Sequence, residues 1–115
     1  MVERLDLSEE SWLDFFNLPK RLIPDLDSFQ VLWDLHPEEI AVVKIWNNEI
    51  PVPRFQQSYL RDYKFSGVVS KAKPLPEEFQ PYLDWINKRE YGIFNEVLVN
   101  WYADGSSYLG SHSDA

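Results

Sequence analysis

A histidine and an aspartate stand two residues apart near residue 115. His112 and Asp114 are separated only by Ser113. In an extended segment, residues i and i+2 project to the same side of the backbone, so the imidazole and the carboxylate would converge. They are two of the three ligands in the two-histidine, one-carboxylate arrangement that holds non-haem iron(II) with open positions. Without context, a His-x-Asp pattern is far more often an ordinary surface histidine beside an aspartate.

The surrounding motifs supply that context. The run from Asn95 to Asp114 contains Asn-x-Tyr, then Asp-Gly, then an apolar residue followed by Gly-x-His-x-Asp. Upstream stand Val-Pro-Arg at 52–54 and Tyr-Lys-Phe-Ser-Gly at 63–67. In this order and spacing, the motifs resemble AlkB-like dioxygenases, iron(II)- and 2-oxoglutarate-dependent enzymes that oxidise alkyl groups off nucleic-acid bases. The resemblance covers about residues 40–114 and is greatest to the branch that repairs alkylated DNA.

The resemblance implies how iron and its co-substrate are held. His112 and Asp114 would bind iron(II), and Asn100 and Tyr102 would hold 2-oxoglutarate. An amide and a phenol on one strand face can hydrogen-bond carboxylate oxygens, although a strand face with a satisfied asparagine is the alternative. The resemblance also implies an α+β chain with a mostly β core, a partial double-stranded β-helix or jelly roll with flanking N-terminal helices.

The resemblance further implies a nucleic-acid site. Tyr63, Lys64 and Phe65 would line the pocket for the target base, where an aromatic face stacks on an extruded base. The alternative for Phe65 is a place in the core. Trp46 stands where the repair branch carries a wedge residue that fills the gap left by the flipped base; the alternative is an aromatic packed on the sheet. Arg54 would support the phosphate backbone or the lesion pocket.

Parts of the family pattern lie outside these 115 residues. A second histidine should complete the iron site, and an arginine should clamp the distal carboxylate of 2-oxoglutarate. His36 stands on the wrong side of the motif, and Ala115 replaces the acidic residue that often follows His-x-Asp. We therefore expect one incomplete domain, either a fragment or a degenerate relative, in which the 115-residue chain alone is inactive.

Several elements must position these residues. Residues 1–39 read as a helical lead-in: Ser8 is a candidate N-cap for a helix with aromatic residues on one face, and a second helix fits 25–35. Residues 40–115 form the motif-bearing β region, with strands expected at 40–46, 49–59, 63–69 and 94–102, and an exit at 108–112. Asn47-Asn48 and Asp104-Gly105 indicate turns, and a helix is expected from Pro81 to Arg89.

Composition fits a folded domain whose charge is unevenly distributed. Hydrophobic residues make up 44% of the chain, the net charge is −8, and there is no cysteine for a disulfide or thiolate site. Residues 1–40 carry ten acidic and three basic residues. In residues 50–73 the balance reverses, with Asp62 alone against five cations: Arg54, Arg61, Lys64, Lys71 and Lys73. This stretch is either a phosphate-binding surface or a solvated basic loop.

The function expected from these observations is oxidative dealkylation of alkylated bases such as 1-methyladenine or 3-methylcytosine. Iron(II), 2-oxoglutarate and molecular oxygen are the implied partners, together with nucleic acid. The alternative is a non-catalytic AlkB-like module that binds nucleic acid or protein, and a third possibility is a member acting on RNA or protein. With no apolar stretch of about 18 residues and no signal-peptide pattern, we expect a soluble protein of the nucleus or cytoplasm.

Overall fold

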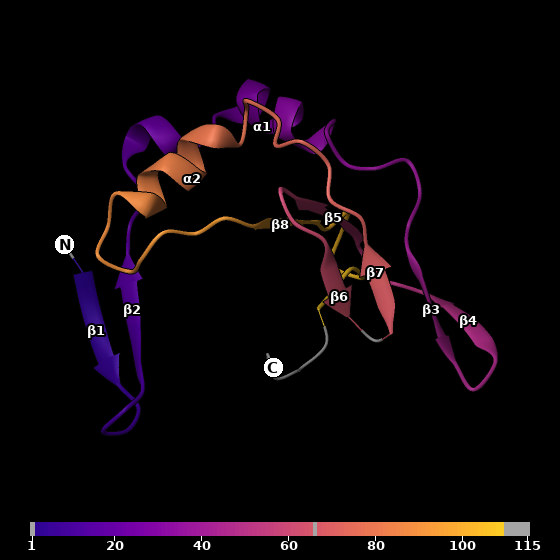
Figure 1. Cartoon of the computed structure of the whole chain (residues 1–115). Helices are drawn as coiled ribbons and strands as arrows, with labels where there is room; N and C mark the ends of the chain where they lie inside the picture. Colours follow the sequence, from indigo (N-terminus) through magenta and orange to yellow (C-terminus); the bar gives the residue numbers. More distant parts are fainter. Residues whose placement is uncertain (1, 66, 110–115) are drawn as a thin grey trace.

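The computed structural model describes residues 2–65 and 67–109, which form an open α+β arrangement with mostly β structure. The elements in chain order are β1 (Val2–Asp6), β2 (Trp12–Phe16), a 3-10 helix (Lys20–Leu22), α1 (Leu26–Trp33), β3 (Val42–Ile45), β4 (Asn48–Pro51), β5 (Phe55–Tyr59), β6 (Tyr63–Phe65), β7 (Val68–Ser70), α2 (Gln80–Asn87) and β8 (Val97–Trp101). Among the described residues, the strands pair as four two-stranded sheets. In Figure 1 the helices lie along one side, and the β1–β2 and β3–β4 hairpins extend at opposite ends. Neither α-helix in the described ranges is long and apolar enough to cross a membrane.

The best-buried sheet joins β5 to β8. The two strands run antiparallel, with Phe55 opposite Trp101 and Tyr59 opposite Val97. Trp101 is 5% exposed, and its indole Nε1 donates to the Leu32 carbonyl in α1 at 2.9 Å. Aromatic rings of Tyr59 and Trp101 flank Phe79, at centroid distances of 5.8 and 6.2 Å. The core therefore lies between this sheet, α1 and the start of α2.

Both expected helices in the middle of the chain are confirmed. Asp25 caps α1 by accepting from the Ser28 backbone N–H at 2.8 Å, as an N-cap aspartate should. The helix ends at Trp33, just before His36-Pro37, whose geometry disfavours further α-helix. Pro81 stands in the first turn of α2, where its missing N–H costs no hydrogen bond.

The helix expected after Ser8 is wrong, and the lead-in is only partly helical. Residues 12–16 form β2, paired antiparallel with β1 so that Leu5 lies opposite Leu13. Aromatic residues at 12, 15 and 16 fit a helical face, but Trp12, Asp14 and Phe16 also share one face of a strand. Ser8 belongs to the turn: its N–H donates to the Ser11 carbonyl at 3.1 Å, and its hydroxyl accepts from Glu10 N–H.

Two further strands differ from expectation. The segment 49–59 is divided into β4 and β5, which pair with different partners, β3 and β8. Pro51 and Pro53 explain the division, because neither can donate to a continuous ladder. The expected strand at 63–69 is the β6–β7 hairpin, in which Gly67 has a φ of +75° that glycine accommodates readily. The strands expected around β3 and β8 are confirmed.

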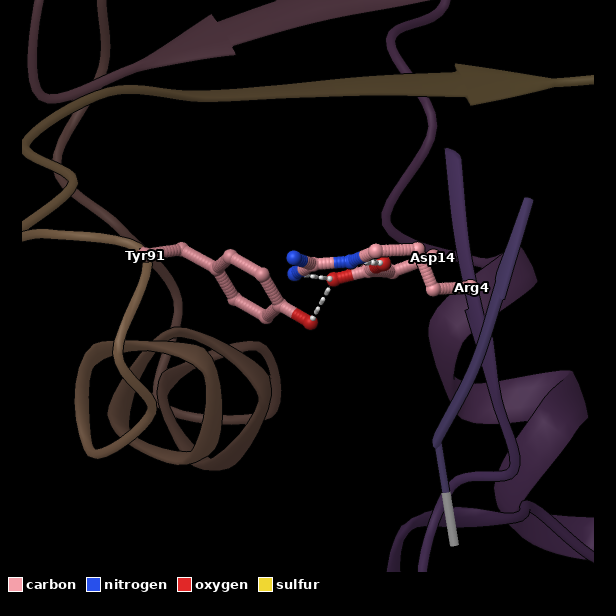
Figure 2. Close-up of polar contacts among 3 residues, drawn as sticks. All are labelled: Arg4, Asp14 and Tyr91. Atoms are coloured by element: carbon pink, nitrogen blue, oxygen red, sulfur yellow. Dashed lines mark hydrogen bonds and ion pairs between the residues drawn. The ribbon is translucent and has the colours of Figure 1, made fainter. Parts of the chain in front are cut away.

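A polar cluster ties the N-terminal hairpin to the loop after α2 (Figure 2). Arg4 donates to both carboxylate oxygens of Asp14, at 2.6 and 2.9 Å, and the Tyr91 hydroxyl donates to the same carboxylate at 2.8 Å. The Phe16 ring stacks on Tyr91 at 6.0 Å and meets Trp85 of α2 at 5.3 Å. Tyr91, 77 positions after Asp14 in the sequence, therefore completes the packing of β2.

The Asp14 cluster should stabilise the β1–β2 hairpin down to low pH. Hydrogen bonds from Arg4, and then from Tyr91, lower the pKa of Asp14 from 3.8 to about 2. Because the folded-state pKa is depressed, the stabilisation is fully present above pH 3.8 and is lost as pH falls through about 2. An NMR titration of the Asp14 carboxyl should show this low midpoint. Asp14→Asn should lower the stability of the hairpin already at neutral pH. Asp6→Asn in the same hairpin is the control, and an Asp14 midpoint near 3.8 would contradict the assignment.

Candidate functional site

Arg54 lies at the centre of a buried polar network beside β5 and β8. Its side chain is inside the fold, with the residue 9% exposed. Nε donates to Asn100 Oδ1 at 3.0 Å, and Nη2 donates to Gln56 Oε1 at 2.8 Å. Nη1 donates to the Tyr108 carbonyl at 3.3 Å. One guanidinium thus joins β5, β8 and the segment after the Asp104 turn.

The link between β4 and β5 holds Arg54 in this place. Val52 is 4% exposed, and its N–H donates to the Ala41 carbonyl at 2.8 Å. The Arg54 N–H donates back to the Val52 carbonyl at 2.8 Å, closing a tight turn that separates the two strands. Tyr108 N–H donates to the Pro53 carbonyl at 3.1 Å. The segment that leads toward residue 110 is therefore held on this link at Tyr108, whose backbone N–H donates to Pro53 and whose carbonyl accepts from the Arg54 side chain.

The guanidinium also orients two side-chain amides. Arginine carries only donors, so each amide must present its oxygen to Arg54 and keep its NH₂ group for another partner. Gln56 and Asn100 are directly opposite in the β5–β8 register, which puts their side chains on one face of the sheet. Gln56 is 8% exposed, and its buried Nε2 has no hydrogen-bond partner among residues 2–65 and 67–109. An unsatisfied buried donor costs about 1–3 kcal/mol, which marks this face as a place where a ligand acceptor would be stabilised.

The sequence-predicted ligand residues are placed as follows. Asn100 is half-buried in β8, and Tyr102 follows the strand with 44% of its surface exposed. His112 and Asp114 lie outside the described residues, so their expected convergence stays a prediction. Within residues 2–65 and 67–109, no three histidine, aspartate or glutamate side chains are grouped to hold a metal ion. Arg54 directs its hydrogen bonds toward Asn100, Gln56 and Tyr108, and its expected support of the phosphate backbone or lesion pocket stays a prediction.

Trp46 occupies the tip of the β3–β4 hairpin, as expected. It is 92% exposed, so the alternative of an aromatic packed on the sheet is wrong. The turn itself is centred on Trp46 and Asn47, one residue earlier than expected, with φ values of +53° and +65°. Asparagine tolerates this left-handed conformation, whereas a bulky tryptophan is disfavoured there. A strained and fully hydrated tryptophan contributes little to folding, which is typical of a residue kept for contact with a partner.

The β6–β7 hairpin carries the remaining expected substrate residues. Tyr63 is half-buried and Lys64 is exposed in β6, whereas the side chain of Phe65 lies outside the described part. Asp62 accepts from the Ala72 N–H at 2.7 Å and faces Lys71 at 3.5 Å; the backbone bond, aided by Lys71, lowers the Asp62 pKa. With Arg54 turned inward, the cations of this stretch that remain exposed are Arg61, Lys64, Lys71 and Lys73.

Sequence reasoning missed Gln56. It carries no motif, and an isolated glutamine in a strand does not indicate a site. The available signal was its spacing, because Gln56 is two residues after Arg54 and the i, i+2 rule predicts a shared side in extended chain. Asn100, the residue opposite Gln56 in the sheet, is 44 residues further along the sequence, so this pairing is known only from the fold.

Comparison with known proteins shows sequence similarity to one group of enzymes. The chain resembles AlkB-like dioxygenases over part of its length. It is 34% identical over 82 residues to the DNA oxidative demethylase ALKBH2 of Homo sapiens, and 33% identical over 78 residues to that of Mus musculus, each covering 65% of this chain. The chain spans about a third of the length of these curated relatives, 30% and 33% respectively. No family model matches the chain.

Proposed function

We propose that the protein takes part in iron(II)- and 2-oxoglutarate-dependent oxidative dealkylation of alkylated nucleic-acid bases, as in DNA repair. The observation that carries the proposal is the Arg54–Asn100 hydrogen bond, which orients an expected co-substrate residue on a buried face. Similarity to DNA oxidative demethylases supports the same reaction. When bound, the iron and co-substrate would supply oxygen activation: one oxygen atom enters the alkyl group and the other enters succinate as carbon dioxide is lost, and the hydroxylated group leaves as an aldehyde.

The chain's own residues would bind and orient. Asn100 would donate through Nδ2 to a carboxylate of 2-oxoglutarate, since Arg54 occupies its oxygen, and the Tyr102 hydroxyl would add a second contact. His112 and Asp114 offer an imidazole and a carboxylate, donor types that suit iron(II). The second histidine and the carboxylate-clamping arginine would come from sequence other than these 115 residues. The same is proposed for the strands that would complete β5 and β8 into a jelly roll.

Nucleic acid would approach the β3–β4 and β6–β7 hairpins. Trp46 would enter the base stack of a duplex, filling the gap left when the target base is extruded. Tyr63, Lys64 and Phe65 would line the pocket that receives the base. The exposed cations of the β6–β7 hairpin and its flanks would contact phosphates, even though the chain as a whole has a net charge of −8. Such a role fits an intracellular protein.

The direct test is turnover by the full-length protein. Purified protein is incubated with iron(II), ascorbate, 2-oxoglutarate and an oligonucleotide containing 1-methyladenine or 3-methylcytosine, as duplex DNA, single-stranded DNA or RNA. We expect succinate and demethylated base in equal amounts, with both lost when 2-oxoglutarate is omitted or iron is chelated. Binding of the oligonucleotide without succinate would favour the non-catalytic module, whose requirements Trp46 and the exposed cations alone could meet.

A further inference from the structure

We propose that Gln56 is a further co-substrate-binding residue, which Arg54 pairs with Asn100 to present two amide donors to one carboxylate of 2-oxoglutarate. This inference rests on the proposed function, because it assigns a residue to the same co-substrate. It goes beyond that function because nothing in the chain's motifs points to Gln56.

The first argument is the orphaned donor. Gln56 Nε2 is buried and finds no partner in the described part of the chain, while Oε1 of the same amide accepts from Arg54 Nη2 at 2.8 Å. The amide cannot rotate by half a turn to relieve this, because its NH₂ group would then face a guanidinium that has only donors. Buried polar atoms are almost always satisfied in native proteins, and each exception calls for a missing partner. That partner must be an acceptor.

The second argument is the matching of two donors. Gln56 and Asn100 are opposite in register, share one face and present their oxygens to one guanidinium. Their NH₂ groups therefore belong to neighbouring amides whose orientation is fixed in the same way. A carboxylate has two oxygens and about four acceptor positions, so it can take both donors, whereas a single carbonyl oxygen is less well matched. Hydrogen bonds to a charged group are also the stronger kind.

The third argument is the distribution of charge. Arg54 brings a positive charge to this face, and no aspartate or glutamate side chain among the described residues has a hydrogen bond or ion pair with it. Arginine remains charged in a protein interior. A bound dicarboxylate would supply the counter-charge through the two amides, without contacting the guanidinium directly. An ordered water is the competing occupant, since it could accept from Nε2 but would bring no charge.

The experiment measures binding and does not require turnover. Calorimetric titration of 2-oxoglutarate into the full-length protein with manganese(II) in place of iron compares wild type with Gln56→Glu and Gln56→Met. Gln56→Glu keeps the acceptor for Arg54 but replaces the NH₂ donor with a carboxylate oxygen, so we expect binding at least about tenfold weaker. Gln56→Met removes the donor without adding charge and should weaken binding about tenfold as well. Gln80→Glu makes the same charge change on exposed α2 and should leave the affinity unchanged.

The outcomes separate the two proposals. Weaker binding in both Gln56 variants, with melting temperatures that show folded protein, supports the inference. Wild-type affinity in a folded Gln56→Met protein means that water satisfies Nε2 and overturns the inference, while the proposed function stands. If Gln56→Glu fails to fold, Gln56→Met alone decides. If wild-type protein fails to bind 2-oxoglutarate, the proposed function fails, and the inference fails with it.

Discussion

Replacing Arg54 by leucine is expected to lower the free energy of unfolding by about 3 kcal/mol. The side chain is buried and donates to three acceptors on Asn100, Gln56 and Tyr108. Leucine fills part of the space but leaves those acceptors without donors. The loss at buried Gln56 costs about 1–3 kcal/mol, and the losses at the part-buried Asn100 and Tyr108 contacts add to it. Chemical denaturation of both proteins measures the difference.

The control for this prediction is Arg61→Leu. Arg61 belongs to the same basic stretch but is exposed, so its replacement should change stability by less than about 0.5 kcal/mol. The two variants also separate two roles. A phosphate-contacting arginine would weaken oligonucleotide binding while leaving the unfolding midpoint unchanged, and that result at Arg54 would overturn the positioning role described above. We expect that pattern at Arg61 instead.

Replacing Trp46 by alanine is expected to reduce dealkylation of duplex DNA by about tenfold or more, because base–aromatic stacking contributes about 1–3 kcal/mol. Activity on a single strand should remain, since extruding a base there leaves no gap opposite a paired strand. Stability should be unchanged or slightly improved, because the side chain is 92% exposed and its φ of +53° is unfavourable for tryptophan. A fluorescent base analogue opposite the lesion would report unstacking by wild-type protein and none by the variant.

Trp12→Ala is the matched control for that experiment. Trp12 is also exposed, at 53%, but it lies on the β1–β2 hairpin against Arg4, outside the region that carries the nucleic-acid motifs. Its loss should leave activity on duplex DNA within about twofold of wild type. Equal losses on duplex and single strand in Trp46→Ala would show that this residue acts by general binding, and the wedge role would have to be abandoned.

The sequence predicted those elements whose causes are local. The helix expected at 25–35 is one, since Asp25 caps α1 through Ser28, only three residues away. The prolines at 51 and 53 are an equally local signal, but one strand was expected over 49–59, where the structure has β4 and β5. The hairpin at 2–16 was not predictable in the same way. Its aromatic spacing satisfies both a helix and a strand, and the decision depends on Arg4 and on Tyr91, a residue 77 positions from Asp14.

The candidate site shows the same division between local and distant causes. Asn100 and Tyr102 were expected to hold 2-oxoglutarate because of the family resemblance, and that role stays a prediction. The burial of Arg54 could not be anticipated, since a basic residue among other basic residues favours a surface role. Asn100 and Tyr108, 46 and 54 positions away, turn it inward by supplying acceptors. A binding role for Gln56 can be inferred only after the structure shows that the Arg54 guanidinium orients its amide.

The short link between β4 and β5 separates two parts of the chain with very different resistance to local opening. Every residue of β4 is exposed, whereas four of the five residues in β5 are buried. Amide hydrogens of the β3–β4 hairpin should therefore exchange with solvent rapidly, and those of β5 should exchange only through much rarer opening. The change in protection from exchange is expected at the link formed by residues 52–54. The hairpin carrying Trp46 is thus expected to fluctuate as a separate cooperative unit while the strands that hold Gln56 and Asn100 remain closed.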